Sequence, residues 1–208
     1  MLKLLKHLRT VNEHRREVRR GCFRLGLYRQ GLMHDLSKYS PTEFFIGAKF
    51  YQGYRSPNNA EREKKGYSEA WIHHKGRNKH HYEYWTDYKP GREGEREGEE
   101  HLIVPTRMPK RYLAEMYVDR VAACEIYNKG HFTYDMPLKY YQRGDYTKLM
   151  EEHTRAELEN LLKMLAANGP DVTESYIRNV ILKHYPGAKL AEFLNSRRKK
   201  VNGNKKNA

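Results

Sequence analysis

Gly31-Leu32-Met33-His34-Asp35-Leu36-Ser37-Lys38 is the stretch around which the rest of this 208-residue chain is organised. It places an imidazole and a carboxylate, two groups that bind transition metals, in adjacent positions. Lys38 follows Asp35 by three residues and His34 by four, and residues at these spacings are neighbours on a helix. We therefore expect His34, Asp35 and Lys38 to face one common site.

Polar residues interrupt the apolar seams of two predicted helices. The spacing of apolar residues predicts the first helix over residues 2–25, with a seam of Leu4, Leu8, Val11, Val18, Cys22 and Leu25. His14 divides the widest gap in this seam. A later helix, from Pro109 to about Asn128, has a seam that Asp119 divides in the same way, made of Tyr112, Met116, Ala123 and Ile126.

A structural explanation exists for each interruption. His14 could donate to a backbone carbonyl, and Asp119 could form a salt bridge with Arg111 or Arg120. A buried carboxylate needs a cation or several hydrogen-bond donors to offset its loss of hydration. One cation shared by the two helices would explain both interruptions together.

Four more histidines lie close together between residues 73 and 81. Residues 67–75 are predicted to form a helix with His74 on its buried face and His73 at its side, and a shift of one residue would exchange the two. Gly76-Arg77-Asn78-Lys79 ends this helix, and a His-His pair follows. The expected inward-facing ligands are therefore His14, His34, Asp35, His74, His80, His81 and Asp119.

The remaining patterns also predict helices, and strands are scarce, so the expected fold class is all-α. A second helix is predicted from Tyr28 to Tyr39. In Ser40-Pro41-Thr42-Glu43, Ser40 is expected to cap the next helix, which ends near Gln52, and Glu43 to complete a capping box. Helices are also predicted at residues 149–167, 172–185 and 190–194.

The chain is expected to form a single domain over residues 1–195. Residues 89–100 alternate Gly, Glu and Arg with almost nothing apolar, which is typical of an exposed, mobile loop. Residues 196–208 are expected to form a disordered basic tail.

The formal charge of +14 is concentrated in two regions, the first predicted helix and the last twelve residues. An excess of positive charge favours anionic partners, which include nucleic acids, nucleotides and other phosphorylated small molecules, although a solvated basic face is an equally simple explanation. Cys22 and Cys124 are expected to be buried thiols rather than a disulfide. No segment approaches the ~20 apolar residues of a membrane span, so we expect a cytoplasmic protein without membrane contact.

The order of these ligands resembles that of the HD-domain superfamily of metal-dependent phosphohydrolases. The resemblance rests on His14-Arg15-Arg16-Glu17-Val18, on His34-Asp35-Leu36-Ser37-Lys38 and on Val118-Asp119-Arg120-Val121-Ala122-Ala123. The additional histidines are similar to those of two-metal members such as the HD-GYP phosphodiesterases. The pattern Trp-x-His-His…Asn-x-His-His, at residues 71–81, resembles a small group of uncharacterised HD-like proteins.

The resemblance covers residues 8–127 and departs from the HD-GYP pattern in two places. No Gly-Tyr-Pro follows His80-His81, so the cleavage of cyclic dinucleotides is not expected. The interval from His14 to His34 is short, which requires a tight turn around Gly26.

The resemblance implies an HD-domain-like helical bundle with two metal ions. One ion would bind His14, His34, Asp35 and Asp119, and Asp35 would bridge to a second ion bound by His74, His80 and His81. Imidazoles with carboxylates favour Mn, Fe, Co, Ni or Zn over Mg or Ca. Asp35 and Lys38 would take part in catalysis, and the phosphate of the substrate would contact Lys38, Lys75, Arg77 and Lys79.

The expected function is that of a metal-dependent phosphohydrolase acting on a nucleotide or another small phosphate ester through a metal-activated water. Two alternatives are a basic nucleic-acid-binding protein with a structural metal and a di-iron oxygenase of the HD type. A structural metal site is complete with about four ligands, whereas seven ligands imply two ions.

Overall fold

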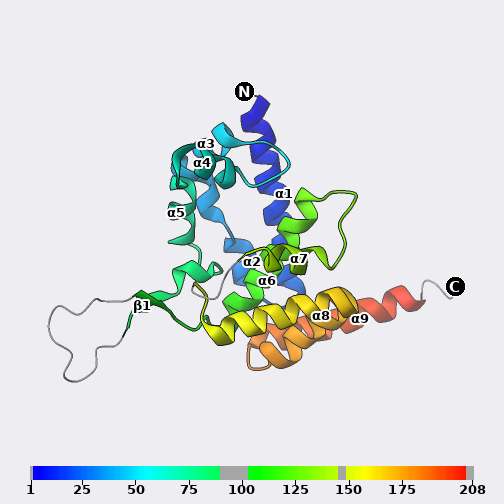
Figure 1. Ribbon diagram of the computed structural model, residues 1–208. Coiled ribbons are helices and arrows are strands. Elements are labelled where there is room, and N and C mark those ends of the chain that lie inside the picture. The colour runs from blue at the N-terminus through cyan, green and yellow to red at the C-terminus, as the bar shows by residue number, and fades with distance from the viewer. Residues whose placement is uncertain (1, 90–102, 145–148, 205–208) are drawn as a thin grey trace, which may run out of the picture.

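The computed structural model describes residues 2–89, 103–144 and 149–204, with the backbone alone for residues 197–204. The structure is 72% helical with one small two-stranded sheet among the described residues, which confirms the all-α prediction (Figure 1). In chain order the elements are α1 (Leu2–Arg24), α2 (Tyr28–Met33), the 3₁₀ helix η1 (Leu36–Tyr39), α3 (Pro41–Phe50), α4 (Pro57–Lys65), α5 (Glu69–Lys75), the 3₁₀ helix η2 (Tyr82–Tyr84), β1 (Thr86–Tyr88), β2 (Ile103–Pro105), α6 (Lys110–Tyr127), α7 (Met136–Gln142), α8 (Glu152–Tyr176), the π-helix η3 (Ile177–Ile181) and α9 (Pro186–Asn204).

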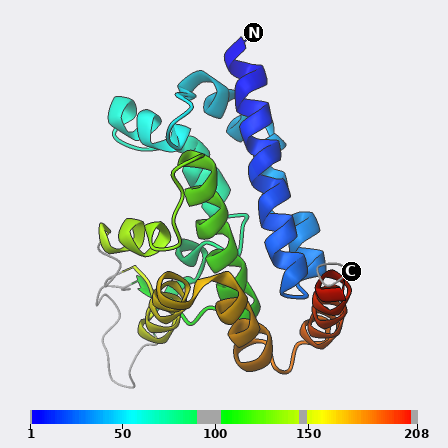
Figure 2. The same cartoon turned by 90° about the vertical axis from the view of Figure 1, so that its right-hand side faces the viewer.

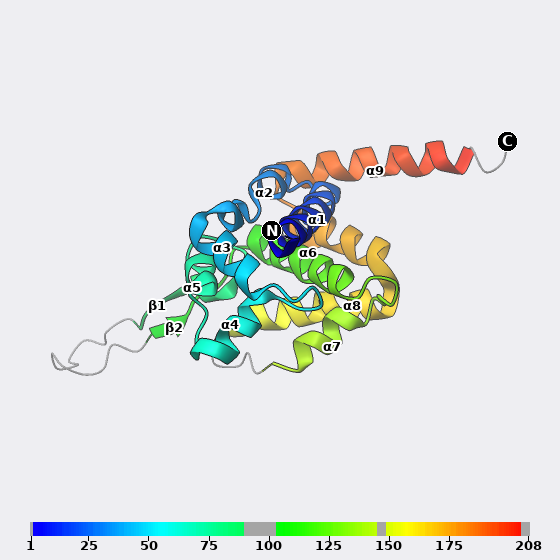
Figure 3. The ribbon, with the colours of Figure 1, turned by 90° about the horizontal axis from the view of Figure 1, so that it is seen from above.

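Helix α6 lies at the centre of the molecule and contacts α1 and α8 on its two sides (Figure 3). Figure 2 shows α1 and α6 running side by side, with α8 crossing near their lower ends. The buried residues of these three helices form one hydrophobic core, which includes Val18, Cys22, Leu113, Met116, Leu158, Leu161, Leu162 and Leu165. The buried seam of α6 therefore passes through Leu113 and Met116, whereas three residues predicted to be buried are only half-buried: Tyr112, Ala123 and Ile126.

A tight turn connects α1 to α2, as the short interval between His14 and His34 requires. Gly26 has a φ of 79°, a left-handed conformation that glycine adopts without steric cost. A Cβ atom on Gly26 would lie 2.1 Å from the carbonyl oxygen of Gly187 at the start of α9. The turn can therefore pack against α9 only because both residues lack a side chain.

Helices α3, α4 and α5 form a second group beside the N-terminal half of α1 (Figure 1). The Oγ atom of Ser40 accepts from the backbone N–H of Glu43 and caps α3, as predicted. Ser68 caps α5 in the same way, and its hydroxyl donates to the fully buried carboxylate of Glu61 in α4. These contacts fix the start of α5, the helix that carries His73 and His74. Helix α4 was not predicted.

The C-terminal helices differ from the prediction in their boundaries. The break expected between residues 167 and 172 is a kink within α8, at Gly169 (φ 75°, ψ −178°) and Pro170. A π-helix follows, and α9 continues as far as Asn204, into the stretch for which we expected a disordered tail. Residues 205–208 lie outside the described part of the chain, as do residues 90–102, which contain most of the predicted mobile loop.

Other structural predictions can be compared directly. The two short strands pair antiparallel, with Thr86 opposite Pro105, and they flank the segment that is not described. Cys22 and Cys124 are free thiols, as predicted, although Cys124 is only half-buried. Within the described residues, every helix is too short or too polar to cross a membrane.

Candidate metal centre

The His-Asp pair lies at a corner between two short helices rather than within one. Helix α2 ends at Met33, His34 has an extended backbone with ψ 127°, and Asp35 has a φ of 54°. The continuous helix predicted from Tyr28 to Tyr39 is therefore wrong. Adjacent side chains on a helix diverge, because successive residues do not face each other. The corner removes this divergence and directs both side chains into the interior, where each is buried.

Arg15 holds this corner from α1. Its Nε donates to the carbonyl oxygen of His34 at 2.8 Å, and Nη2 donates to that of Leu32 at 3.1 Å. Its Nη1 donates to the hydroxyl of Tyr39 at 3.0 Å. A left-handed conformation is unfavourable for a residue other than glycine, and it persists only where surrounding contacts determine it. Arg15 provides these contacts, and it is adjacent in the chain to the predicted ligand His14.

The fold brings all seven predicted ligands together in two groups. Within each group, one possible ligand atom of every residue lies within 4.8 Å of the others. The first group consists of His14, His34, Asp35 and Asp119, and the second consists of Asp35, His74, His80 and His81. These are the sets that the resemblance implied for two ions, with Asp35 as the residue common to both.

The two carboxylate oxygens of Asp35 face different groups. Its Oδ2 atom lies 3.6 Å from Nε2 of His14 and 3.3 Å from Nε2 of His34. Its Oδ1 atom lies 3.3 Å from Nε2 of both His74 and His80. Asp119 completes the first group, since its Oδ1 atom lies 2.9 Å from Nε2 of His14 and 3.4 Å from that of His34.

These atoms are close together but do not satisfy one another by hydrogen bonds. The Oδ1 atom of Asp35 is buried without a hydrogen-bond partner, as are the Nε2 atoms of His14, His34, His80 and His81, whereas Oδ2 of Asp35 makes an ion pair with Lys38. Buried polar atoms are nearly always paired, and each exception needs an explanation. Nitrogen and oxygen atoms that converge on a common centre are the arrangement that a metal ion requires, so the residues present fit a metal.

The electrostatics of the cluster also favour a cation. Burial lowers the pKa of His34, but Asp35 and Asp119 outweigh it and raise the pKa above its usual value. Burial likewise lowers the pKa of His74, and Asp35 and Glu43 outweigh it. The raised pKa values of His34 and His74 reflect the negative charge of the carboxylates around them. By contrast, burial and the neighbouring His80 lower the pKa of His81, which keeps this imidazole neutral.

Lys38 lies at the edge of the cluster. Its Nζ atom is 2.6 Å from Oδ2 of Asp35, and 31% of its side chain is exposed. Burial lowers the pKa of Lys38, but Asp35 and Asp119 outweigh it and raise the pKa. Lys38 is therefore a cation that contacts the shared carboxylate and also reaches the surface.

Glu43 is a buried acid of the site that the sequence interpretation assigned to another role. Its Oε1 and Oε2 atoms accept from Nδ1 of His73 at 2.6 Å and from Nδ1 of His74 at 2.7 Å. It does not complete a capping box, because the backbone N–H of Ser40 already donates to the carbonyl of Ser37. Glu43 was thus identifiable as an acid at the start of a helix, but its histidine partners were not.

Glu115 is a second buried acid of the site, and the sequence interpretation missed it. It lies in α6, four residues before Asp119, and is 4% exposed. Burial raises the pKa of Glu115, but hydrogen bonds from His34 and His80 outweigh it and hold the pKa at about 2. The spacing of four residues from Asp119 was the available signal, since it places both acids on one face of the helix.

Besides Lys38, the predicted phosphate contacts lie in the segment between His74 and His80. Lys75 is half-buried at the end of α5, and Arg77 donates to the carbonyl oxygen of His73 at 3.1 Å. Lys79 lies over the ring of Tyr84, with Nζ 5.6 Å from the centroid. Their part in binding phosphate stays a prediction.

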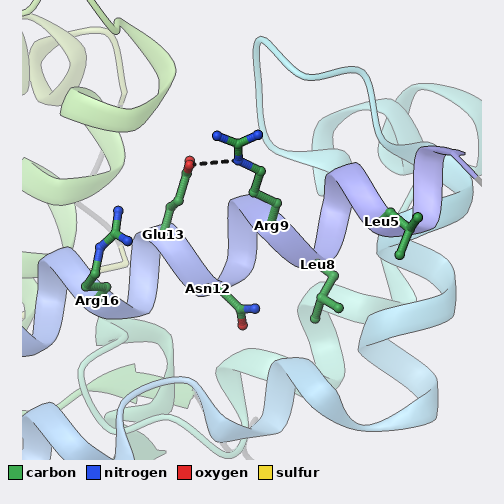
Figure 4. A pocket seen from close by; sticks show the side chains of 6 residues that line it. All are labelled: Leu5, Leu8, Arg9, Asn12, Glu13 and Arg16. Carbon is green, nitrogen blue, oxygen red and sulfur yellow. Dashed lines mark hydrogen bonds and ion pairs between the residues drawn. The ribbon is translucent and has the colours of Figure 1, made fainter.

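A pocket of about 420 Å³ lies elsewhere, on the outer face of α1 (Figure 4). Its walls include the ion pair between Arg9 and Glu13, at 3.2 Å, and the side chain of Asn12. At 100° per residue, this face of α1 is opposite to the face that carries His14. The pocket is therefore separate from the two candidate ligand groups.

Comparison with known proteins gives one match, a family of unknown function (DUF5662), over residues 3–164. The match covers more than half of the chain. The chain belongs to this family. The region shared with DUF5662 runs from α1 into α8 and contains all the ligands of both groups. No curated protein and no solved structure matches the chain.

Proposed function

We propose that the protein is a metal-dependent phosphohydrolase of the HD type, which hydrolyses a phosphate ester of a nucleotide or another small molecule at a site with two divalent ions. One observation carries the proposal: two buried ligand groups share Asp35, and each carboxylate oxygen of Asp35 faces one group. A site for a single structural metal needs about four ligands and no shared residue.

Each part of the chain has a defined task in this proposal. When bound, two divalent ions would acidify a water molecule and stabilise the charge that develops on the phosphoryl oxygens. Lys38 binds a phosphate oxygen of the substrate, because it is cationic, partly exposed and next to Asp35. Asp119, His14 and the corner at Asp35 hold the ligand atoms in place from three different elements.

The resemblance to the HD superfamily supports this proposal independently of the geometry. The chain has the order His, His-Asp, Asp, with Lys38 in the His-Asp-x-x-Lys position. The absence of Gly-Tyr-Pro after His80-His81 argues against cyclic dinucleotides as substrates. The five imidazoles favour Mn, Fe, Co, Ni or Zn as the bound ions.

Elemental analysis of the purified protein tests the metal content. We expect about two transition-metal ions per wild-type chain and a large loss of metal in the variant His34→Ala/Asp35→Ala. His153→Ala is a suitable control, because the side chain of His153 is 67% exposed and makes its ion pair with Glu151, far along the chain from both groups. Full metal retention by the double variant would end the proposal.

A screen of nucleoside phosphates and simple phosphate esters with Mn or Co tests the reaction. Asp119→Ala should lower turnover to the background rate and leave the helical content unchanged, because Asp119 contacts the ligand histidines at the edge of the core. Circular dichroism provides the check on folding. Undiminished turnover by Asp119→Ala would remove this residue from the site.

The same ligands would also suit two irons, so oxidation is the second candidate. Running the screen with and without oxygen separates the two reactions, since only an oxygenase consumes oxygen and yields an oxidised product. A nucleic-acid-binding role is less well supported, because seven ligands exceed the needs of a structural metal.

A further inference from the structure

The rings of His34 and His80 lie between two carboxylates. The centroids of the two rings are 4.3 Å apart. His34 belongs to the first of the two groups that share Asp35 and His80 to the second, and both also cluster with Glu115. On one side, the Nε2 atoms of His34 and His80 face opposite oxygens of Asp35, each at 3.3 Å. On the other side, the Nδ1 atoms of both rings lie 3.0 and 3.3 Å from the same oxygen, Oε1 of Glu115.

We propose that Glu115 is a positioning residue that couples the two ion sites, so that a single carboxylate sets the metal affinity of both. A carboxylate that accepts from Nδ1–H fixes the tautomer of an imidazole and makes its Nε2 lone pair a stronger ligand. Glu115 does this for one histidine of each group. The inference rests on the proposed function, because it requires that both groups bind ions.

Glu115 is itself held in place. Its second oxygen, Oε2, accepts from Nε2 of Gln30 at 3.0 Å, and the same amide donates to the carbonyl oxygen of Arg111 at 2.9 Å. The acid lies on α6 one turn before the ligand Asp119. Helix α6 thus carries both Asp119, a proposed ligand of the first group, and Glu115, which contacts one histidine of each group.

Glu43 provides a natural comparison within the same site. It accepts from Nδ1 of His74, which belongs to the second group, and from His73, which belongs to neither group. Among the described residues it contacts no histidine of the first group. Removing the charge of Glu43 should therefore lower the affinity for one ion only.

The test is a titration of metal-free protein with Zn²⁺ or Co²⁺, followed by calorimetry and by the visible spectrum of cobalt, for three Glu→Gln variants. Loss of a carboxylate that accepts a hydrogen bond from a metal-binding histidine typically lowers metal affinity 10- to 100-fold. We expect Glu115→Gln to lower the affinity for both ions by such a factor. Glu43→Gln should lower the affinity for one ion only. Glu125→Gln, an exposed position on the same helix, should bind both ions as the wild type does.

Two results for Glu115→Gln would overturn the inference but leave the proposed function intact. One is wild-type affinity for both ions, and the other is a lowered affinity for one ion alone. A wild type that binds no metal would overturn both proposals. A second measurement does not depend on the folding of the variant. In the zinc-loaded wild type, the nitrogen NMR signals of His34 and His80 should both report an Nδ1–H tautomer, and a proton on Nε2 in either ring would contradict the assignment.

Discussion

At the scale of single residues, backbone conformation matters as much as side-chain identity. Asp35 is the only residue other than glycine with a positive φ in the described part of the chain, and it is also the residue shared by both ligand groups. Asp and Asn tolerate this conformation better than most residues, because their short polar side chains can bond locally. Asp35 therefore combines a ligand role with a conformational one.

Two substitutions separate these roles. Asp35→Asn should keep the left-handed corner but lower the affinity for both ions, because a neutral amide replaces the bridging carboxylate. Asp35→Ala removes the same ligand and also suffers the left-handed penalty, so it should unfold with a free energy about 1 kcal/mol lower than that of Asp35→Asn. Urea unfolding of both metal-free variants measures the difference. Equal stability would mean that the corner does not strain this residue.

At the scale of elements, the ends of the helices determine where the ligands lie. The turn at Gly26 lets α2 return alongside α1, and the caps of α3 and α5 set the directions of Glu43 and His74. Local patterns predicted most of these ends, because capping residues act within a few positions of the chain. The short interval from His14 to His34 pointed correctly to a turn at Gly26.

The turn between α1 and α2 should tolerate no side chain. Gly26→Ala combines a positive φ with a contact of 2.1 Å to the backbone of Gly187, so we expect a loss of about 2–5 kcal/mol in the free energy of unfolding. Gly66→Ala is the matched control, because Gly66 has a φ of 83° and no neighbouring atom within 4 Å of the added Cβ. It should cost about 1 kcal/mol. Equal losses in thermal or urea unfolding would show that contact with α9 is unimportant.

The start of α8 should make a pH-dependent contribution to stability. The carboxylate of Glu151 accepts from the backbone N–H of Thr154 at 2.8 Å. Burial raises the pKa of Glu151, but hydrogen bonds from Thr154 and His153 outweigh it and hold the pKa at about 2. A lowered pKa means that the contribution is complete above the unfolded value of about 4.3 and is lost as the pH falls towards about 2.

Glu151→Ala should therefore lower the free energy of unfolding by about 1 kcal/mol at pH 7. The difference from wild type should shrink between pH 5 and pH 3, as measured by urea unfolding at each pH. Glu152→Ala, an exposed neighbour, should change stability little at any pH. A Glu151→Ala difference that is constant down to pH 3 would contradict the assigned cap.

At the scale of the whole molecule, the ligand groups connect parts of the chain that are otherwise separate. The ligands come from α1, from the corner after α2, from α5, from the segment before η2 and from α6. Without an ion, four carboxylates (Asp35, Glu43, Glu115 and Asp119) lie close to one another around the histidines. Cations bound among these carboxylates would link the five segments in the folded state alone.

Metal ions should therefore raise the melting temperature of the wild type. A ligand that binds only the folded state at 100 times its Kd stabilises it by about 2.7 kcal/mol for each site. Thermal unfolding with Zn²⁺ or Mn²⁺, and again after addition of a chelator, measures this effect. The variant His34→Ala/Asp35→Ala should show a much smaller shift. A wild type whose melting temperature does not respond to any of these ions would contradict the two-ion proposal.

The sequence by itself determined the helical class, most helix positions and the identity of the seven clustered residues. His14 and Asp119 could be identified because they interrupt apolar seams, and the period of such a seam is a local property of a helix. Only the tertiary structure decided the corner at Asp35 and the partners of Glu43 and Glu115. These features depend on contacts between residues far apart in the chain, such as Arg15 with His34 and Glu115 with His80, and no local spacing encodes such contacts.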